Sequence, residues 1–374
     1  MTKHERIMRQ TRFEDVDRIP LLGGWMNSAE HLQELGGTTE EEFWADGWAG
    51  GLRAYQALGV DGMLGHIVPA GQNSVRQGRI LDDEHAHRTT EDVLKFIDET
   101  KTDDQIIDAF DAEDYYAKER ASMEVTQAKY RDILHLPARW NCMPSFGYYG
   151  TFGYRAFFET VALYPDAWER VFRAGGVAAR LRNECLARVY NDMGHPPLIM
   201  CGDDICDNRG PMVSPQFLDD NYWQWAKHAL EPLCEAGIKP ICHSDGNVMP
   251  LIDQILDVGF AGMQGFQEEC GVHLSDLVKL RTRDGDPLVF FCGMVVTQTM
   301  PWGSVDDVRA DIEYAIDVTD GGRGLFLFPA NVINPEVPVE NIRAAYAHAK
   351  EYSTDYDTPA DRRHTEWPWA LRDA

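Results

Sequence analysis

A histidine and an aspartate two positions apart, His243 and Asp245, are the side chains of this sequence best suited to chemistry. They follow the apolar run 238–242 and precede Gly246, so a strand that ends there presents both of them before a turn. An imidazole and a carboxylate together make half of a binding site for a borderline or hard metal ion. In a plainer interpretation, His243 forms a hydrogen bond inside the protein and Asp245 caps the helix that follows.

Pairs of adjacent carboxylates follow two other apolar runs. Asp203 and Asp204 come after the run 198–201, and since side chains alternate along an extended backbone, we expect only one of them to face a pocket. That one can be a metal ligand, a general acid or base, or a hydrogen-bond acceptor for a substrate; a loop aspartate that caps backbone amides is an equal alternative. Glu268 and Glu269 hold the corresponding place after a later run. One of them can complete the site, whereas solvated carboxylates are the commoner outcome.

A glycine-containing stretch of aromatic residues lies between positions 140 and 158. Aromatic rings beside flexible glycines can wall a pocket for a flat apolar ligand, and they can equally pack a long loop onto the rest of the protein. Arg139 and Arg155 stand beside this stretch and can orient a carboxylate, although a single arginine is usually a surface charge. The rings are Phe146, Tyr148, Tyr149, Phe152, Tyr154, Phe157 and Phe158.

The elements that must position these residues repeat one order: a helix, a glycine or proline stop, and a short apolar strand. The clearest helix begins with Ser214 as N-cap and Pro215 in the first turn, and it ends at Gly237. Further helices are predicted over 251–258, 274–283 and 305–318. The predicted strands cover residues 19–22, 60–65, 133–137, 198–201, 238–242, 260–265, 288–293 and 324–328.

Eight strands, most of them separated by helical patterns, predict a single α/β domain over residues 1–374, a (β/α)8 TIM barrel. An insertion at 69–132, between strands 2 and 3, holds a predicted hairpin at 75–81 and polar helices. In such barrels the chemistry lies where strands end. That rule selects Asp203, Asp204, His243, Asp245, 267–269, Cys292 and Asn331. Of these, Cys292 is more typical of a core residue than of a ligand.

Composition excludes several classes of protein. A formal net charge of −26 over 374 residues argues against binding to nucleic acid or to an anionic membrane surface. No apolar run is long enough to span a membrane, and the charged start 1–10 does not resemble a signal peptide. Eight dispersed cysteines suit a reducing compartment, so we expect a cytoplasmic protein. No serine-hydrolase elbow, dinucleotide-binding turn or phosphate loop is present in the sequence.

Over nearly its whole length the chain resembles the uroporphyrinogen decarboxylase superfamily. The resemblance rests on the order and spacing of several short motifs, and it implies a (β/α)8 barrel. The motifs are Glu5-Arg6-Ile7-Met8, Val16-Asp17-Arg18-Ile19-Pro20, 198–204, Gly210-Pro211-Met212-Val213-Ser214-Pro215, 243–247 and Pro338-Val339-Glu340-Asn341.

The true decarboxylases of that superfamily grip the porphyrin carboxylates with arginines after the first strand, whereas residues 21–28 contain no arginine. The segment 243–247 looks more like the corrinoid-dependent methyltransferase branch, whose thiol-activating members bind zinc through His-x-Cys and a distant cysteine. This chain keeps His243 but has Asp245 in place of the first cysteine, and Asn331 stands near the place of the second. An oxygen-rich site suits Lewis-acid polarisation of an ether or carboxylate oxygen better than thiol activation.

The resemblance therefore implies methyl transfer from a small, methoxylated aromatic substrate to the cob(I)alamin of a separate corrinoid protein. His243 and Glu268 are the expected ligands of a zinc ion, and Asp203, Asp204 and Asp245 the expected acids or further oxygen ligands. The expected substrate-binding residues are Phe146, Tyr148, Tyr149, Tyr154 and Asn331. Two alternatives stay open: a metal-free decarboxylase or lyase of a small carboxylated substrate, and a non-enzymatic binding or scaffold protein. The sequence leaves the oligomeric state undecided, with a homodimer as one candidate.

Overall fold

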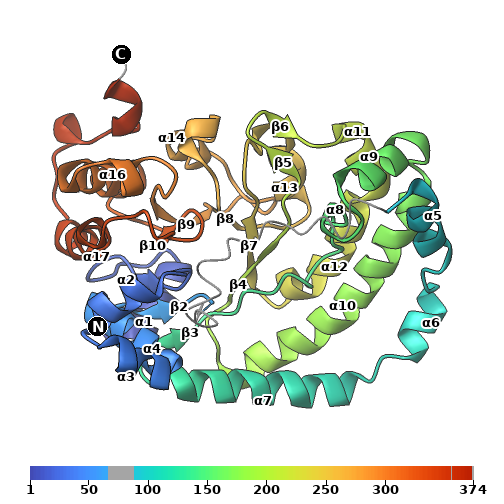
Figure 1. The fold of residues 1–374 in the computed structure, drawn as a ribbon, viewed down its shortest axis with the longest axis horizontal. Coiled ribbons are helices and arrows are strands. Elements are labelled where there is room, and N and C mark those ends of the chain that lie inside the picture. Colours follow the sequence, from blue (N-terminus) through green and yellow to red (C-terminus); the bar gives the residue numbers. More distant parts are fainter. Residues whose placement is uncertain (66–87, 355, 373–374) are drawn as a thin grey trace.

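The computed structural model describes residues 1–65, 88–354 and 356–372 (Figure 1). Parallel strands lie toward the middle of the molecule, and most of the helices surround them. The strands are β1 (Leu22–Gly23), β2 (Gly62–Met63), β3 (Leu134–His135), β4 (Leu198–Gly202), β5 (Cys206–Asp207), β6 (Gly210–Pro211), β7 (Lys239–His243), β8 (Gly262–Gln264), β9 (Val289–Met294) and β10 (Leu325–Pro329).

The strands form two parallel sheets and one small hairpin. The first sheet has the order β1-β2-β3, and the second has the order β10-β9-β8-β7-β4. Isolated parallel bridges join the sheets at both edges, from Leu21 to Leu327 and from Ala138 to Met200. The pair β5 and β6 is antiparallel.

The first sheet differs from the second in the length of its strands. Its three strands have two residues each, whereas β4, β7 and β10 have five and β9 has six. Side-chain hydrogen bonds also attach the first sheet and the helix α1 beside it to the rest of the protein. The amide of Gln10 donates to the carbonyls of Gly322 and Leu325, and the hydroxyl of Tyr346 donates to the carbonyl of Leu22.

Helices occupy the connections between the strands. They are α1 (Lys3–Thr11), α2 (Ala29–Gly36), α3 (Glu40–Ala45), α4 (Gly47–Leu58), α5 (Thr90–Asp98), α6 (Asp103–Asp108), α7 (Ala112–Tyr130), α8 (Tyr149–Phe152), α9 (Tyr154–Leu163), α10 (Ala167–Met193), α11 (Pro215–Asn221), α12 (Trp223–Glu235), α13 (Ile252–Asp257), α14 (Leu274–Leu277), α15 (Thr299–Trp302), α16 (Val305–Val318) and α17 (Val339–Ser353).

Alternation along the strands divides the core into two clusters. Side chains such as Ile241, Phe291 and Phe328 belong to a smaller cluster that draws on strands of both sheets. Their neighbours Cys242 and Phe290 belong to the larger cluster, which includes the apolar faces of the helices. Because successive side chains of a strand point to opposite faces, the strands lie between the two clusters.

A buried ionic group attaches α1 to the first sheet. The carboxylate of Asp61, which is fully buried just before β2, accepts hydrogen bonds from the guanidinium groups of Arg6 (2.6 Å) and Arg18 (2.7 Å) and from the amide of Leu21 (2.9 Å). Asp17 binds the other side of Arg6 but is 42% exposed. This group therefore connects the N-terminal helix, the approach to β1 and the start of β2.

The predicted elements agree with the structure in most places. Each predicted strand overlaps an observed strand, Ser214 caps α11 through the amide of Phe217, and α16 has the predicted bounds. The predicted helix at 274–283 is wrong beyond Leu277, because a turn with Gly285 at φ +89° brings Arg281 opposite Pro287 instead. Between β2 and β3 lie α5, α6 and α7, and the predicted hairpin at 75–81 lies outside the described residues.

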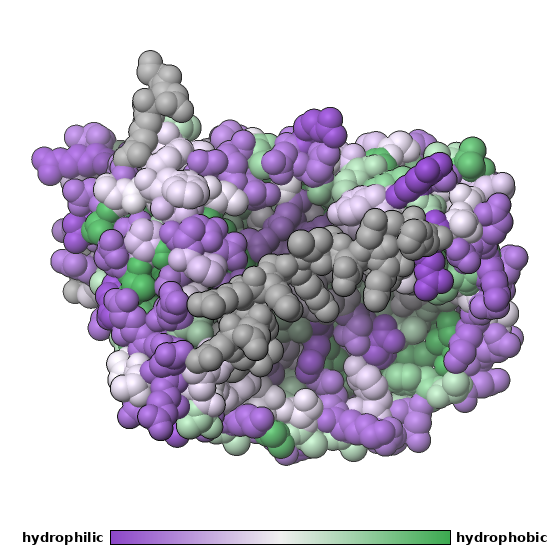
Figure 2. Space-filling model, viewed as in Figure 1, coloured by the Kyte–Doolittle hydropathy of each residue, from purple (hydrophilic) through white to green (hydrophobic). Residues whose placement is uncertain are grey.

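The visible surface of the molecule is largely polar. Hydrophilic residues cover most of the face drawn in Figure 2, apart from the grey atoms.

Within the described ranges, no helix has both the length and the apolar character that crossing a bilayer requires. All eight cysteines are free thiols.

Candidate functional site

The candidate site lies where β4 and β7 end side by side. Gly202, the last residue of β4, is the parallel partner of His243, the last residue of β7. Gly202 has φ +155°, and a Cβ atom there would lie 2.0 Å from the carbonyl oxygen of His243. Only glycine allows this approach. The close approach of the two strand ends brings Asp204, two residues after β4, next to His243 and Asp245.

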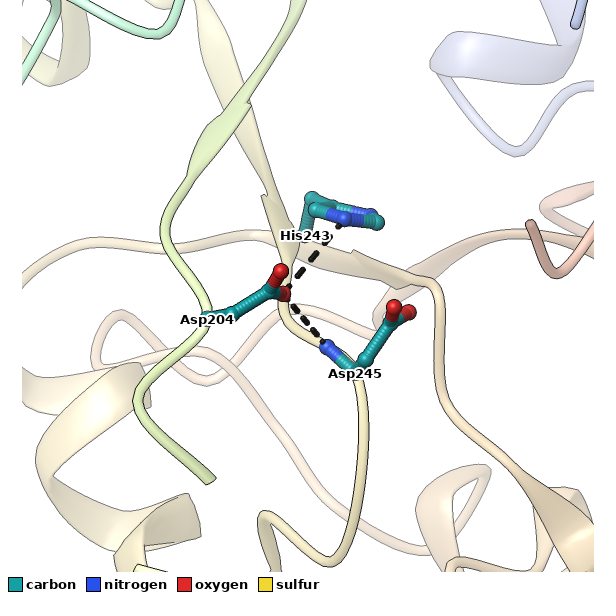
Figure 3. Close-up of side chains that lie close together, drawn as sticks. All are labelled: Asp204, His243 and Asp245. Carbon is teal, nitrogen blue, oxygen red and sulfur yellow. Dashed lines mark hydrogen bonds and ion pairs between the residues drawn. The ribbon is translucent and has the colours of Figure 1, made fainter. Parts of the chain in front are cut away.

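These three side chains form a compact group, shown in Figure 3. A carboxylate oxygen of Asp204 lies 3.7 Å from Nε2 of His243 and accepts the backbone N–H of Asp245 at 3.0 Å. One ligand atom from each of the three residues lies within 4.8 Å of the others. One imidazole and two carboxylates are a donor set that suits zinc and other divalent ions.

The hydrogen bond on the other ring nitrogen leaves Nε2 of His243 available as a ligand. The amide nitrogen of Gln264, the last residue of β8, donates to the carbonyls of Pro329 (3.0 Å) and Ala330 (2.9 Å). Its amide oxygen must therefore face Nδ1 of His243, 2.5 Å away, and accept a proton from it. In the neutral ring the proton is thus on Nδ1, and Nε2, which lies 3.7 Å from Asp204, has the free lone pair.

This arrangement predicts a strong effect of Gln264 on metal affinity. In Gln264→Leu the imidazole loses the group that fixes its tautomer and orientation, and we expect zinc to bind about 10–100-fold more weakly. Competition with a chromophoric chelator measures the dissociation constant. The exposed Gln224 on α12 offers a control, Gln224→Leu, which should bind zinc like the unmodified protein. A change below about threefold in folded Gln264→Leu would contradict this role.

Asp245 has one carboxylate oxygen with a partner and one without. Its Oδ2 accepts a hydrogen bond from the amide of Asn331 at 2.6 Å, whereas Oδ1 is buried with no partner in the described part of the chain. Burial raises the pKa of Asp245 to about 6, with His243 opposing and Asp204 adding to the shift. A buried oxygen with a free lone pair next to an imidazole nitrogen fits the binding of a cation.

Two tryptophan rings enclose the imidazole on its other sides. The ring centroids of Trp25 and Trp140 lie 5.4 Å and 5.1 Å from that of His243, both edge to face. Trp25 is nearly buried, whereas Trp140 is 48% exposed. As a result the His243 side chain is 9% exposed, whereas that of Asp204 is 44% exposed, so the group lies at the boundary between the interior and solvent.

An open pocket of about 450 Å³ adjoins the carboxylates. Its apolar wall consists of Tyr149, Tyr154, Phe158 and Met212, and its polar wall includes Asp204 and Asp245. The rings of Tyr149 and Tyr154 stack with centroids 5.0 Å apart, and the hydroxyl of Tyr149 donates to the carbonyl of Asp204. The pocket therefore combines flat apolar surface with two of the three side chains in Figure 3, Asp204 and Asp245.

The other aromatic residues of the stretch lie behind this wall. Phe146 is fully buried and packs edge to face against Phe157 and Tyr222. Tyr148 packs against Trp168. These rings support the wall rather than form its surface, so the structure brings Tyr149 and Tyr154 to the pocket but not Phe146 or Tyr148.

Asp203 points away from the cluster, toward the aromatic stretch. Its carboxylate accepts hydrogen bonds from the backbone amides of Phe146 (2.6 Å) and Gly147 (3.1 Å) and from the hydroxyl of Ser145 (2.9 Å). Burial raises the pKa of Asp203, and the two amides oppose that rise. The contacts of Asp203 position the loop that carries Tyr149.

The structure does not bring Glu268, Arg139 or Arg155 to the cluster. Glu268 accepts the amide of Leu274 and lies 2.9 Å from Nδ1 of His273. Arg139 pairs with Glu119, and the exposed Arg155 pairs with Glu159 on α9. Of the expected zinc ligands, His243 is therefore in the group, whereas Glu268 is outside it and Asp204 and Asp245 supply the carboxylates.

Comparison with known proteins extends the description of the fold. No family model and no curated protein sequence matches the chain. Among solved structures, it is similar to a methyltransferase from Methanosarcina mazei, with a TM-score of 0.59 and 14% sequence identity. The match covers 94% of this chain and 99% of the other. The two proteins thus share an α/β fold over nearly their whole length.

Proposed function

We propose that this protein is a methyltransferase that moves a methyl group from a small methoxylated aromatic substrate to the cob(I)alamin of a separate corrinoid protein. The observation that carries the proposal is the group of Asp204, His243 and Asp245 beside an aromatic pocket at the strand ends. The similarity in fold to a methyltransferase is consistent with it.

We further propose that the two parallel sheets close into a (β/α)8 barrel. The bridges Leu21–Leu327 and Ala138–Met200 join the outer strands of both sheets, which supports closure. The smaller core cluster, to which strands of both sheets contribute, is the packing expected inside such a barrel. Its open end is then the place where the strand ends meet, which is where the candidate site lies.

In the proposed reaction, Asp204, His243 and Asp245 would hold a divalent cation, for which zinc is the natural candidate. When bound, that ion supplies Lewis acidity toward an ether oxygen. Tyr149, Tyr154 and Phe158 bind the face of the aromatic ring. The bond between the methyl carbon and the aryl oxygen breaks, its electron pair stays on the oxygen as a phenolate, and the cob(I)alamin provides the electron pair for the new cobalt–carbon bond.

The proposal is tested with the full chain, free cob(I)alamin and 2-methoxyphenol as the methyl donor. We expect the purified protein to hold about one zinc ion per chain and to form methylcobalamin, which absorbance detects. Removal of the metal with a chelator should stop the reaction, and added zinc should restore it. Metal-loaded protein that forms no methylcobalamin from methoxyarenes would sink the proposal.

A metal-free decarboxylase is the second candidate, because burial raises the pKa of Asp245 to about 6 and so makes its carboxyl group a proton donor near neutral pH. Against it, the described residues that line the pocket include three aspartates, and none of them is a lysine or arginine that could bind a substrate carboxylate. Release of carbon dioxide that persists after chelation would favour this candidate over methyl transfer.

A further inference from the structure

The side chain of Asp203 contacts both the loop that leads into α8 and the backbone of the candidate ligand Asp204. Its Oδ2 accepts hydrogen bonds from Phe146 (2.6 Å), Ser145 (2.9 Å) and Gly147 (3.1 Å), which belong to that loop. Its Oδ1 accepts the backbone N–H of Asp204 at 3.0 Å. One carboxylate therefore binds four donors, and three of them come from the loop before the apolar wall of the pocket.

The helix α8, which carries Tyr149, does not fix its own position. It has four residues, and the side chain of its N-cap residue makes no capping hydrogen bond. A helix this short is not stable alone, so its place depends on the residues before it. The N–H of Gly150 donates to the carbonyl of Gly147, which Asp203 holds. The hydroxyl of Tyr149 donates to the carbonyl of Asp204 at 3.0 Å, so residues just after β4 position both ends of Tyr149.

The loop approaches Asp203 so closely that little space is left between them. A Cβ atom on Gly147 would lie 3.1 Å from Oδ1 of Asp203, so a larger residue there must displace the loop or the carboxylate. Gly150 in α8 differs, because a Cβ atom there would have no neighbour within 4 Å among the described residues. A methyl group added to this segment therefore disturbs the contact with Asp203 at one glycine and not at the other.

An asparagine at position 203 has the shape of this carboxylate but not its hydrogen-bonding capacity. The amide has one oxygen and one NH2 group, whereas N–H donors face both oxygens of Asp203. In either orientation the NH2 group meets an N–H group, and the loop must move to relieve that contact. The carboxylate of Asp204 should keep its bond to the amide of Asp245, because that bond does not involve residue 203.

We propose that Asp203 is a positioning residue that sets the affinity of the pocket for the substrate ring, whereas its neighbour Asp204 serves the metal. This inference rests on the proposed function, because it takes Tyr149, Tyr154 and Phe158 as the surface that binds the ring. Asp203 acts through Tyr149 and does not contact the substrate. A wall that is in place before the ligand arrives need not be ordered on binding, so the ligand binds more tightly.

The test is calorimetric titration of the zinc-loaded full chain with 2-methoxyphenol in the absence of cob(I)alamin, which measures binding without methyl transfer. We expect Asp203→Asn to bind the ligand about tenfold more weakly, because the loop and Tyr149 must then be ordered on binding. Gly147→Ala should weaken binding by a smaller factor. Gly150→Ala, its matched control, should bind like the unmodified protein. Zinc affinity should stay within about threefold of the unmodified protein in all three variants.

Kinetics add a readout that a general loss of folding or of metal would not give. In the methylcobalamin assay, Asp203→Asn should raise KM and leave kcat unchanged. The inference is overturned if folded Asp203→Asn binds 2-methoxyphenol with unchanged affinity, or if its zinc affinity falls in the same proportion. It is also overturned if Gly147→Ala and Gly150→Ala are indistinguishable, and this pair decides the question should Asp203→Asn not fold.

The same titration separates this inference from the proposed function. An unmodified protein that binds 2-methoxyphenol but forms no methylcobalamin contradicts the proposed function and leaves the comparison of binding affinities intact. An unmodified protein that does not bind 2-methoxyphenol overturns both.

Discussion

Replacing His243 with alanine is expected to abolish the proposed metal binding and nearly all of the proposed methyl transfer. The imidazole supplies the one nitrogen ligand of the group, and its Nε2 is free because Gln264 holds the proton on Nδ1. Loss of a direct ligand should weaken zinc binding by more than the roughly 100-fold that loss of a supporting hydrogen bond can cost. Several kcal/mol of Lewis-acid stabilisation correspond to a fall of about 10³-fold in kcat/KM. Elemental analysis and the methylcobalamin assay measure the two effects.

The control for this variant is a half-buried histidine that lies outside the cluster. His228 on α12 lies outside the cluster and contacts Trp225, so His228→Ala should keep its metal and its activity. Added imidazole should partly restore zinc binding to His243→Ala, because the space between Trp25 and Trp140 is then free for it. A folded His243→Ala protein that retains stoichiometric zinc would show that the ligands lie elsewhere.

Replacing Asp61 with alanine is expected to lower the free energy of unfolding by about 3–5 kcal/mol. The carboxylate is fully buried and binds two guanidinium groups, which are themselves only 7% and 11% exposed. Without Asp61, Arg6 keeps Asp17 as a partner, whereas Arg18 loses its ion-pair partner at a site with little access to water. Urea unfolding followed by circular dichroism measures the change.

Asp17 provides a matched comparison, because it binds the same arginine at 2.7 Å but is 42% exposed. Asp17→Ala should therefore cost no more than about 1 kcal/mol, as exposed ion pairs do. Both carboxylates bind Arg6 at nearly the same distance, whereas Asp61 is buried and also binds Arg18 and the amide of Leu21, so the comparison measures burial together with these added contacts. If Asp61→Ala is no less stable than Asp17→Ala, the buried group does not hold the N-terminal helix as described.

Much of the fold is predictable because local sequence signals agree with the final structure. The N-cap Ser214 and the alternation of strands and helices place the elements within a few residues, and α16 has the predicted bounds. The first three strands are shorter than predicted, since an apolar run shows which residues are buried but not how many of them pair with a neighbour. Helical periodicity also does not show that α14 ends at Leu277 and that a turn with Gly285 follows.

The site is predictable only in part. Strand ends point to Asp204, His243, Asp245 and Asn331, which the structure brings together. The direction of a side chain beyond a strand depends on backbone angles, which is why Asp203 turns to the aromatic loop instead. Gln264 is absent from the predicted site, because its orientation is fixed by two carbonyl groups after a different strand. A polar residue at the end of an apolar strand is nevertheless a sequence signal that could indicate such a position.

Trp25 and Trp140 were also outside the predicted site. They are distant from His243 in the sequence, and no spacing relates them to it. Trp25 has φ +59°, a backbone conformation that is rare for a tryptophan and that the sequence does not reveal. Residues of this kind become visible only when the chain is folded, because their contribution is position rather than chemistry.

The two-residue strands of the first sheet have a consequence for local opening and for tolerance to mutation. Few backbone hydrogen bonds hold the first sheet together, so its stability depends on hydrogen bonds of polar side chains such as Asp61, Gln10 and Tyr346. Its amides should exchange with solvent deuterium sooner than those of β9 and β10. The positions least tolerant of random substitution on this side of the molecule are then buried polar residues, whereas on the other side they are the aliphatic and aromatic residues of the longer strands.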